Sequence, residues 1–151
     1  MRRYVVGFLF SFPSWGPNVL LIRKTHPEWQ RGRHNGIGGA IEDAETPTEA
    51  MGREFREETG CAEPVAWEEF ARLSDHRGYL VHFFRATGTV EMQLAAEAHT
   101  READEPVASW NTGNIDRGTQ QLQLIPNLGW LIPLALDRAV SIADVSERPA
   151  I

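Results

Sequence analysis

Three carboxylates crowd one short segment of this chain. Residues 53–58 read Arg-Glu-Phe-Arg-Glu-Glu, so Glu54, Glu57 and Glu58 lie within five positions. In a helix, which turns by about 100° per residue, these acids fall within an arc of about 100° on one face. Apolar side chains project within or beside the same arc: Ala50, Met51 and Phe55. Because acids carried towards a buried face either become neutral or bind a cation, the pattern favours a metal site.

Capping residues predict a helix over residues 47–59. Thr46 is a favoured N-cap, Pro47 suits the first helical position, and Glu49 stands where a capping-box acid reaches back. Gly60 suits the residue that follows the last turn. The acidic segment is therefore expected to lie in the middle and last turns of a well-delimited helix.

The acidic face has an alternative interpretation. An isolated segment of this kind is more often a solvated helix surface held by salt bridges than a metal site. Arg53 stands four residues from both Glu49 and Glu57, a spacing that favours ion pairs. Arg53 is thus expected to orient Glu57, and Glu45 is expected to have a structural role near Arg53 or the helix start.

The wider segment resembles the Nudix box of the Nudix hydrolases. It reads Gly39, five residues, Glu45, seven residues, and then Arg53-Glu54-Phe55, Glu57-Glu58 and Gly60-Cys61. Every charged and glycine position of that box is filled. Phe55 and Cys61 stand where the family usually carries Leu, Ile or Val, and both are apolar. The resemblance implies an α/β protein with the Nudix α/β/α sandwich and a mixed central sheet.

By position, the resemblance also implies a Mg²⁺ site, with Mn²⁺ as a substitute metal. Family members bind the metal through the backbone carbonyl of the first glycine of the box and through helix glutamates. Here these groups are Gly39, Glu54, Glu57 and Glu58. With Arg53 the three glutamates form the expected catalytic set, and members differ in which acid deprotonates water. A later loop commonly adds an acid, and Glu105, five residues before Trp110, is the candidate. The alternative for Glu105 is a solvated acidic run.

Residues 34–39 are similar to the stretch before the box in the oxidised-purine nucleoside triphosphatases of the family. There an asparagine contacts the nucleobase, and an aromatic residue six positions earlier contributes to the pocket. The matching residues are Asn35 and Trp29, for which the alternatives are an Asn-Gly turn and a Trp that covers the loop. Where that branch carries paired acids, this chain has Asn127 and Leu128. The expected substrate site therefore comprises Trp29, Asn35 and Asn127.

The resemblance implies Mg²⁺-dependent hydrolysis of a nucleoside triphosphate to nucleoside monophosphate and pyrophosphate, as in nucleotide-pool sanitation. One alternative is hydrolysis of another nucleoside diphosphate derivative, such as a nucleotide sugar. Another is a non-catalytic Nudix module that binds nucleotides or a protein partner. The intact Arg53 and its three glutamates argue against a pure binder.

Composition limits the partners and the compartment. A chain of 151 residues with 42% hydrophobic and 24% charged residues fits one globular domain, residues 1–151. A formal net charge of −6 argues against binding to nucleic-acid polymers or to anionic membranes, which need a basic surface. No segment approaches the length of a membrane span, and a single Cys suits a reducing compartment. We expect a cytoplasmic monomer or homodimer with a small-molecule nucleotide substrate.

The hydrophobic pattern predicts strands on both sides of the acidic helix. Strands are expected over residues 3–12, 19–23, 36–42, 63–73, 79–88 and 106–110, the last of these being the final strand. Loops are expected over residues 25–35 and 111–118. Residues 91–104 are compatible with a helix, and residues 129–145 are expected to form an amphipathic helix with Trp130 and Leu134 in the core.

Overall fold

The computed structural model describes residues 1–116, 123–139 and 143–147. Within these ranges one sheet contains β1 (Arg2–Ser11), β2 (Asn18–Arg23), β3 (His34–Asn35), β4 (Ile37–Ala40), β5 (Glu68–Asp75), β6 (Tyr79–Thr87), β7 (Val107–Asn111) and β8 (Ala143–Glu147). The helices are α1 (Pro47–Thr59), α2 (Val90–Thr100), α3 (Thr112–Asp116) and α4 (Leu128–Leu136), with a 3₁₀ turn at Glu28–Gln30. None of these helices combines the length and apolarity that crossing a membrane requires.

The sheet is mixed, and β1 lies at its centre. β1 pairs in parallel with β6, with Tyr4 opposite Val81. Its other edge pairs antiparallel with β4 over residues 4–7 and with β2 only at Phe10 and Ser11. Because β2 and β4 share one edge of β1, the sheet divides between them. The β3–β4 segment crosses this division, since β3 pairs with β2 and β4 pairs with β1.

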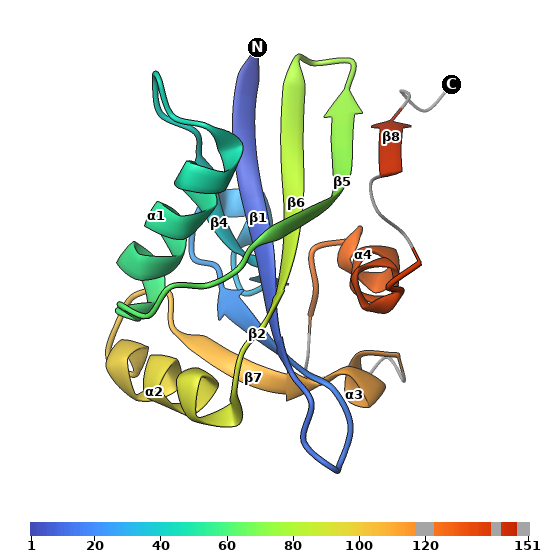
Figure 1. The fold of residues 1–151 in the computed structure, drawn as a ribbon. Coiled ribbons are helices and arrows are strands. Elements are labelled where there is room, and N and C mark those ends of the chain that lie inside the picture. The colour runs from blue at the N-terminus through green and yellow to red at the C-terminus, as the bar shows by residue number, and fades with distance from the viewer. Residues whose placement is uncertain (117–122, 140–142, 148–151) are drawn as a thin grey trace.

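Helices cover both faces of the sheet. Figure 1 shows α1 and α2 on one side and α4 on the other. Alternate side chains of β1 separate accordingly: Val5 and Leu9 pack in one core cluster with Phe55 of α1, whereas Phe8 packs in a second cluster with Leu131 of α4. The expected α/β/α sandwich with a mixed central sheet is confirmed.

Helix α1 begins and ends at the expected residues. The backbone N–H of Glu49 donates to Oγ1 of Thr46 at 3.1 Å, and Gly60 adopts the left-handed conformation with φ of 72°. The Thr46 hydroxyl donates in turn to the Glu49 carboxylate at 3.1 Å. The Glu49 carboxylate thus meets the Thr46 hydroxyl and not the Thr46 N–H that a capping box would use. The expected Glu49–Arg53 ion pair is absent from the described residues, where Arg53 pairs with Glu45 instead.

The expected helix over residues 129–145 is wrong after Leu136, where residues 137–139 and 143–145 are not helical; residues 140–142 lie outside the described ranges. α4 ends at Leu136, Asp137 is extended, and β8 follows. The buried side chains of α4 repeat at helical spacing: Leu128, Leu131, Ile132 and Ala135. Beyond them, parallel pairing of β8 with the open edge of β5 replaces the helix. The strand at residues 106–110 is therefore not the final one, because a long-range pairing outweighs the local pattern.

Four smaller expectations also need correction. The loop expected over residues 25–35 contains the 3₁₀ turn and ends in β3. Trp130 is 41% exposed rather than in the core, because it lies off the buried stripe of α4, whereas Leu134 packs against the core as expected. The strand expected from residue 63 begins at Glu68. The loop expected over residues 111–118 contains α3, and its last two residues lie outside the described ranges.

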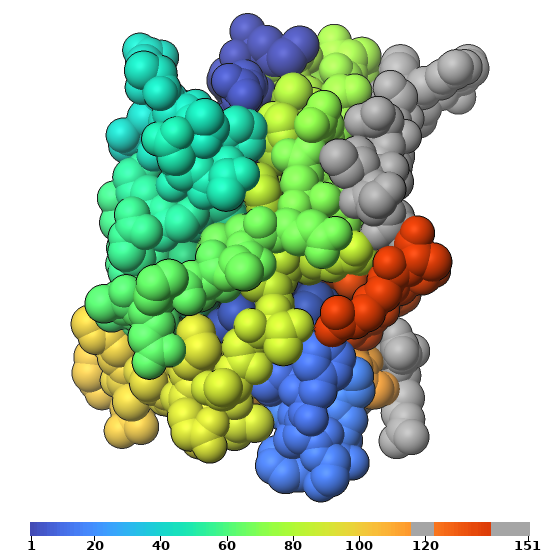
Figure 2. Space-filling view, in the orientation of Figure 1, coloured from blue at the N-terminus to red at the C-terminus, as the bar shows by residue number. Residues whose placement is uncertain are grey.

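The loop between β1 and β2 projects from the body of the molecule, as the blue segment at the bottom of Figure 2 shows. It carries two exposed aromatic side chains, Phe12 at 50% and Trp15 at 65% exposure. Neither residue lines the large pocket described below, so Trp15 offers a matched control for exposed tryptophans.

Candidate functional site

Two glycines of β4 allow the acidic face of α1 to approach the sheet. A Cβ atom at Gly39 would lie 2.5 Å from Oε1 of Glu54, so a side chain there would displace that carboxylate. The backbone N–H of Gly38 donates to Oε2 of Glu58 at 3.3 Å. The structure thus brings together three of the residues that the Nudix resemblance selected: Gly39, Glu54 and Glu58.

The solvent exposure of the glutamates differs across the acidic face of α1. The Glu54 side chain is 13% exposed, whereas that of Glu57 is 59% exposed. Glu57 accepts a hydrogen bond from Nη1 of Arg53 at 3.3 Å, which is the contact expected to orient it. Glu57 therefore lies at the solvent edge of the group, although the sequence places all three acids on one arc.

Arg53 ties the acidic segment together. Its guanidinium donates to Glu45 through Nε at 2.7 Å and Nη2 at 2.9 Å, and to Glu54 through Nη1 at 2.8 Å. It also donates to the backbone carbonyl of Ala40 at 3.0 Å. The hydrogen bonds from Arg53 lower the pKa of Glu45 to about 2. The expected structural role of Glu45 beside Arg53 is confirmed.

Burial and mutual repulsion raise the pKa values of the inner acids. Burial raises the pKa of Glu58 to about 8, and the charges of Glu54 and Glu105 act in the same direction. Burial also raises the pKa of Glu54, against the opposing hydrogen bond from Arg53. Additional positive charge nearby favours the ionised form of such carboxylates. A divalent cation would supply that charge.

Glu105 belongs to this neighbourhood and not to a solvated acidic run. Its side chain is 14% exposed, it pairs with Lys24 at 3.2 Å, and it accepts from the Thr25 N–H at 2.8 Å. Burial disfavours its ionisation, but Thr25 and Lys24 outweigh burial and lower its pKa. Because its charge also acts on Glu58, Glu105 lies close to the buried end of the acidic face.

The candidate ligands are carboxylate and carbonyl oxygens, which are the ligand types that Mg²⁺ prefers. Within the described ranges, no three acidic, histidine or cysteine side chains converge in an arrangement ready to hold a metal. Three of the candidate ligands are engaged by basic side chains: Arg53 pairs with Glu54 and Glu57, and Lys24 pairs with Glu105. Metal binding would exchange part of these ion pairs for metal contacts.

A pocket of about 880 Å³ opens beside Gly38 and Gly39. It is lined by the three residues expected to bind substrate, Trp29, Asn35 and Asn127, which come from segments far apart in the sequence. Its volume lies within the range of small-molecule sites. The expected base-binding residues therefore share one pocket with the two β4 glycines that contact the acidic face of α1.

The three expected substrate residues differ in what they offer a ligand. Trp29 is 58% exposed, so its ring is available for stacking. Oδ1 of Asn35 accepts from the Gly36 N–H at 2.8 Å, so its NH₂ group remains for a ligand. Asn35 lies in β3 and not in the Asn-Gly turn that was the alternative. Oδ1 of Asn127 is buried and accepts no hydrogen bond from the described residues.

Gln30 also lines this pocket, although the sequence pattern did not indicate it. Its Oε1, like Oδ1 of Asn127, is buried without a hydrogen-bond partner among the described residues. Such a group costs about 1–3 kcal/mol, so both oxygens are placed to accept hydrogen bonds from a ligand. Tyr4 and Tyr79, whose stacked ring centroids are 5.6 Å apart, also line the pocket. No sequence signal marks these residues, because only the fold brings them together.

Comparisons with known proteins agree with this geometry. Residues 1–115 match the family model of the NUDIX domain. NrtR of Shewanella oneidensis has a TM-score of 0.72 at 20% identity over 92% of this chain and 64% of its own, so this chain spans less than two thirds of NrtR. A mutT/nudix family protein from Listeria innocua has a TM-score of 0.71 at 18% identity, covering 91% of this chain and 93% of its own.

A third similar structure is the NUDIX domain of Shewanella oneidensis NrtR complexed with ADP ribose, with a TM-score of 0.67 at 19% identity over 91% of this chain and 88% of that one. At these identities the likeness shows the fold. No curated protein sequence matched the chain. The family match extends over the β4 glycines, the acidic helix and Glu105, which is most of the chain. The chain therefore belongs to the Nudix family of hydrolase domains.

Proposed function

We propose that this protein hydrolyses a nucleoside triphosphate to the nucleoside monophosphate and pyrophosphate with Mg²⁺. One observation carries the proposal: the 880 Å³ pocket joins Gly38 and Gly39, against which two buried acids of α1 pack, to Trp29, Asn35 and Asn127. A base against Trp29 would direct its phosphates towards the glycines. The reactive phosphoanhydride would then lie next to the acidic face.

The chain's own residues have separate tasks in this proposal. Bound Mg²⁺ supplies charge neutralisation at the phosphates and a lowered pKa for the attacking water. The groups that would hold it are the Gly39 carbonyl and the carboxylates of Glu54, Glu57, Glu58 and Glu105. Arg53 holds Glu54 in place through its 2.8 Å hydrogen bond. Lys24 lines the pocket and adds positive charge beside an anionic substrate, which a chain of net charge −6 needs.

A second candidate reaction is cleavage of a nucleoside diphosphate linked to another group. The specific observation is that the pocket contains Arg77 and the stacked Tyr4 and Tyr79 in addition to the expected base-binding residues. These side chains offer a surface to a group on the far side of a diphosphate. The complex of the NrtR NUDIX domain with ADP ribose supports considering such a compound as a substrate.

A hydrolysis panel tests the proposal. Nucleoside triphosphates, ADP-ribose and a nucleotide sugar would be incubated with the protein and Mg²⁺, and products would be identified by chromatography, with and without added pyrophosphatase. Monophosphate and pyrophosphate from triphosphates would support the first candidate. Turnover confined to ADP-ribose or the nucleotide sugar would favour the second. Binding without turnover of any compound would contradict both and leave a non-catalytic nucleotide module.

Replacing Trp29 with alanine is expected to raise KM about tenfold with little change in kcat. Stacking of a base, worth about 1–3 kcal/mol, acts in the ground and transition states alike because it lies away from the cleaved bond. Initial-rate kinetics with the best triphosphate provide the measurement. Trp15→Ala, which removes an equally exposed indole from the β1–β2 loop, should leave KM unchanged. An unaltered KM in the Trp29 variant would place the base elsewhere.

Discrimination between dGTP and its 8-oxo form is expected to be small. Asn127 and Leu128 stand where the oxidised-purine branch carries acids, so a carboxylate that could select a purine tautomer is missing. We expect less than about a tenfold difference in kcat/KM, or about 1.4 kcal/mol. Asn127→Asp restores one acid and should increase the preference for the oxidised base. A much larger preference in the wild-type protein would show that another group replaces the acids.

A further inference from the structure

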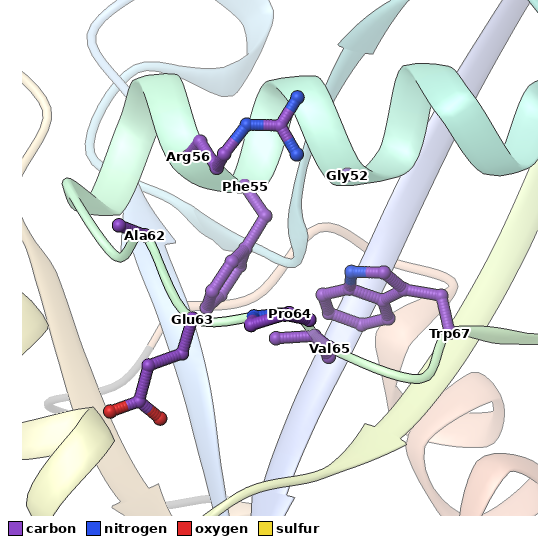
Figure 3. A pocket seen from close by; sticks show the side chains of 8 residues that line it. All are labelled: Gly52, Phe55, Arg56, Ala62, Glu63, Pro64, Val65 and Trp67. Carbon is purple, nitrogen blue, oxygen red and sulfur yellow. The ribbon is translucent and has the colours of Figure 1, made fainter.

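We propose that a second pocket, formed between α1 and the segment leading to β5, binds a small organic carboxylate. This pocket has a volume of about 260 Å³ and is lined by residues that include Gly52, Phe55, Arg56, Pro64, Val65 and Trp67. It shares no lining residue with the 880 Å³ pocket. Figure 3 shows Phe55 and Arg56 reaching it from the helix and Trp67 from the segment before β5.

Trp67 presents an unused donor at this pocket. Its indole Nε1 is buried and has no hydrogen-bond partner among the described residues. The ring is held edge-on against Phe55, with centroids 5.4 Å apart. Leaving a buried donor unpaired costs about 1–3 kcal/mol, and such a group calls for a specific explanation in a native protein. An acceptor on a ligand would satisfy it.

Arg56 provides a second donor group on the same side of the pocket. The Arg56 side chain is exposed and forms no ion pair with the described residues. Arg53, by contrast, pairs with the neighbouring Glu54. Figure 3 shows its guanidinium lying along α1 towards Gly52, while the nitrogen-bearing edge of Trp67 faces the helix and the Glu63 carboxylate points away. The guanidinium and the indole N–H can therefore meet one anionic group, with the exposed Arg56 side chain changing its rotamer.

Gly52 fits this assignment. Glycine in the middle of a helix costs about 1 kcal/mol relative to alanine. A Cβ atom at position 52 would lie 3.3 Å from Nη1 of Arg56, so the absence of a side chain gives the guanidinium room against the helix. Gly52, which destabilises α1, therefore lies at the position in the pocket wall where a side chain would crowd the Arg56 guanidinium.

The apolar residues that line the pocket determine which uncharged part the ligand should carry. Phe55, Pro64 and Val65 offer apolar surface next to the two donors. A carboxylate on a small apolar body would satisfy Trp67 and Arg56 and bury its hydrocarbon against these walls. Inorganic phosphate would use the donors alone, and a neutral amide would forgo the charge-assisted contact with Arg56.

Titration with benzoate tests the site. The chain has five Trp residues, so its indole N–H signals in a ¹H–¹⁵N spectrum can be followed separately, with Trp67→Phe identifying that of Trp67. We expect the Trp67 signal to shift saturably while the other four stay in place. Arg56→Gln should weaken the affinity about tenfold or more, because a hydrogen bond to a charged group is lost. Arg101→Gln, which removes an exposed arginine at the end of α2, should leave it unchanged.

Benzamide and inorganic phosphate complete the test. Benzamide has the same ring without the charge, and phosphate has the charge without the ring, so both should bind more weakly than benzoate. An unmoved Trp67 signal, an equal response to benzamide, or an unchanged affinity in Arg56→Gln would overturn the proposal. Phosphate binding as tightly as benzoate would also overturn it, because the apolar walls would then contribute nothing.

Discussion

Glu58→Gln is expected to reduce turnover roughly a hundredfold or more and yet to stabilise the metal-free protein. In the proposed site Glu58 supplies a charged oxygen to Mg²⁺, and even residues that only orient such ligands contribute 10–100-fold. Glutamine keeps the size of the side chain and one carbonyl oxygen but removes the charge. Steady-state rates at saturating Mg²⁺, measured beside the melting temperature, show whether the loss is chemical or structural.

The stability gain follows from the raised pKa of Glu58. Burial raises this pKa from 4.5 to about 8, so the folded protein binds the proton more tightly than the unfolded chain does. The contribution of the carboxyl group to stability is therefore complete below about pH 4.5 and is lost as the pH rises through about 8. Glutamine does not titrate. In EDTA the variant should melt above the wild-type protein at pH 8, and the difference should shrink towards pH 4.5.

Two further variants sharpen this result. Glu57→Gln should also slow turnover, but without the stability gain, because the Glu57 side chain is 59% exposed. Glu91→Gln, at the exposed start of α2, should change neither property. Near-wild-type turnover of Glu58→Gln at saturating Mg²⁺ would remove Glu58 from the metal site. A lower melting temperature at pH 8 would show instead that the carboxylate is well paired.

The parts of the fold that the sequence predicted are those with local causes. The bounds of α1 depend on Thr46, Pro47 and Gly60, which act within one turn of the helix, and the structure confirms them. Gly39 and Glu54, which the resemblance assigns to one metal site, also lie next to each other in the structure. Local chemistry therefore predicted the helix, and motif spacing selected neighbouring residues for the candidate site.

The parts that were wrong or missed depend on distant contacts. The pairing of β8 with β5 joins segments about 70 residues apart, and no local pattern in residues 129–145 reveals it. Gln30 faces the pocket because the β2–β3 loop meets the segment around Asn127 there. The difference in exposure between Glu54 and Glu57 arises from the position of β4, which covers only part of the helix face. Helical periodicity cannot supply this information.

Arg53→Ala is expected to lower metal affinity about 10–100-fold and to lower the melting temperature as well. The first effect follows from Glu54, which loses the 2.8 Å hydrogen bond that holds it beside Gly39. The second follows from Glu45, which loses two hydrogen bonds of 2.7 and 2.9 Å. Calorimetric titration with Mg²⁺ or Mn²⁺ measures the affinity, and thermal unfolding measures the stability.

The pH dependence of the Arg53 variant separates its two roles. Arg53 lowers the pKa of Glu45 from 4.5 to about 2, so this pair stabilises the protein above about pH 4.5 and ceases to do so as the pH falls through about 2. The gap in melting temperature between wild type and Arg53→Ala should therefore narrow over that window. Arg53→Lys keeps the charge but not the two-pronged geometry, so it should recover part of the stability and less of the metal affinity. Arg101→Ala should change neither. Unchanged metal affinity in Arg53→Ala, together with a reduced melting temperature, would show that Arg53 stabilises the fold without positioning the acids.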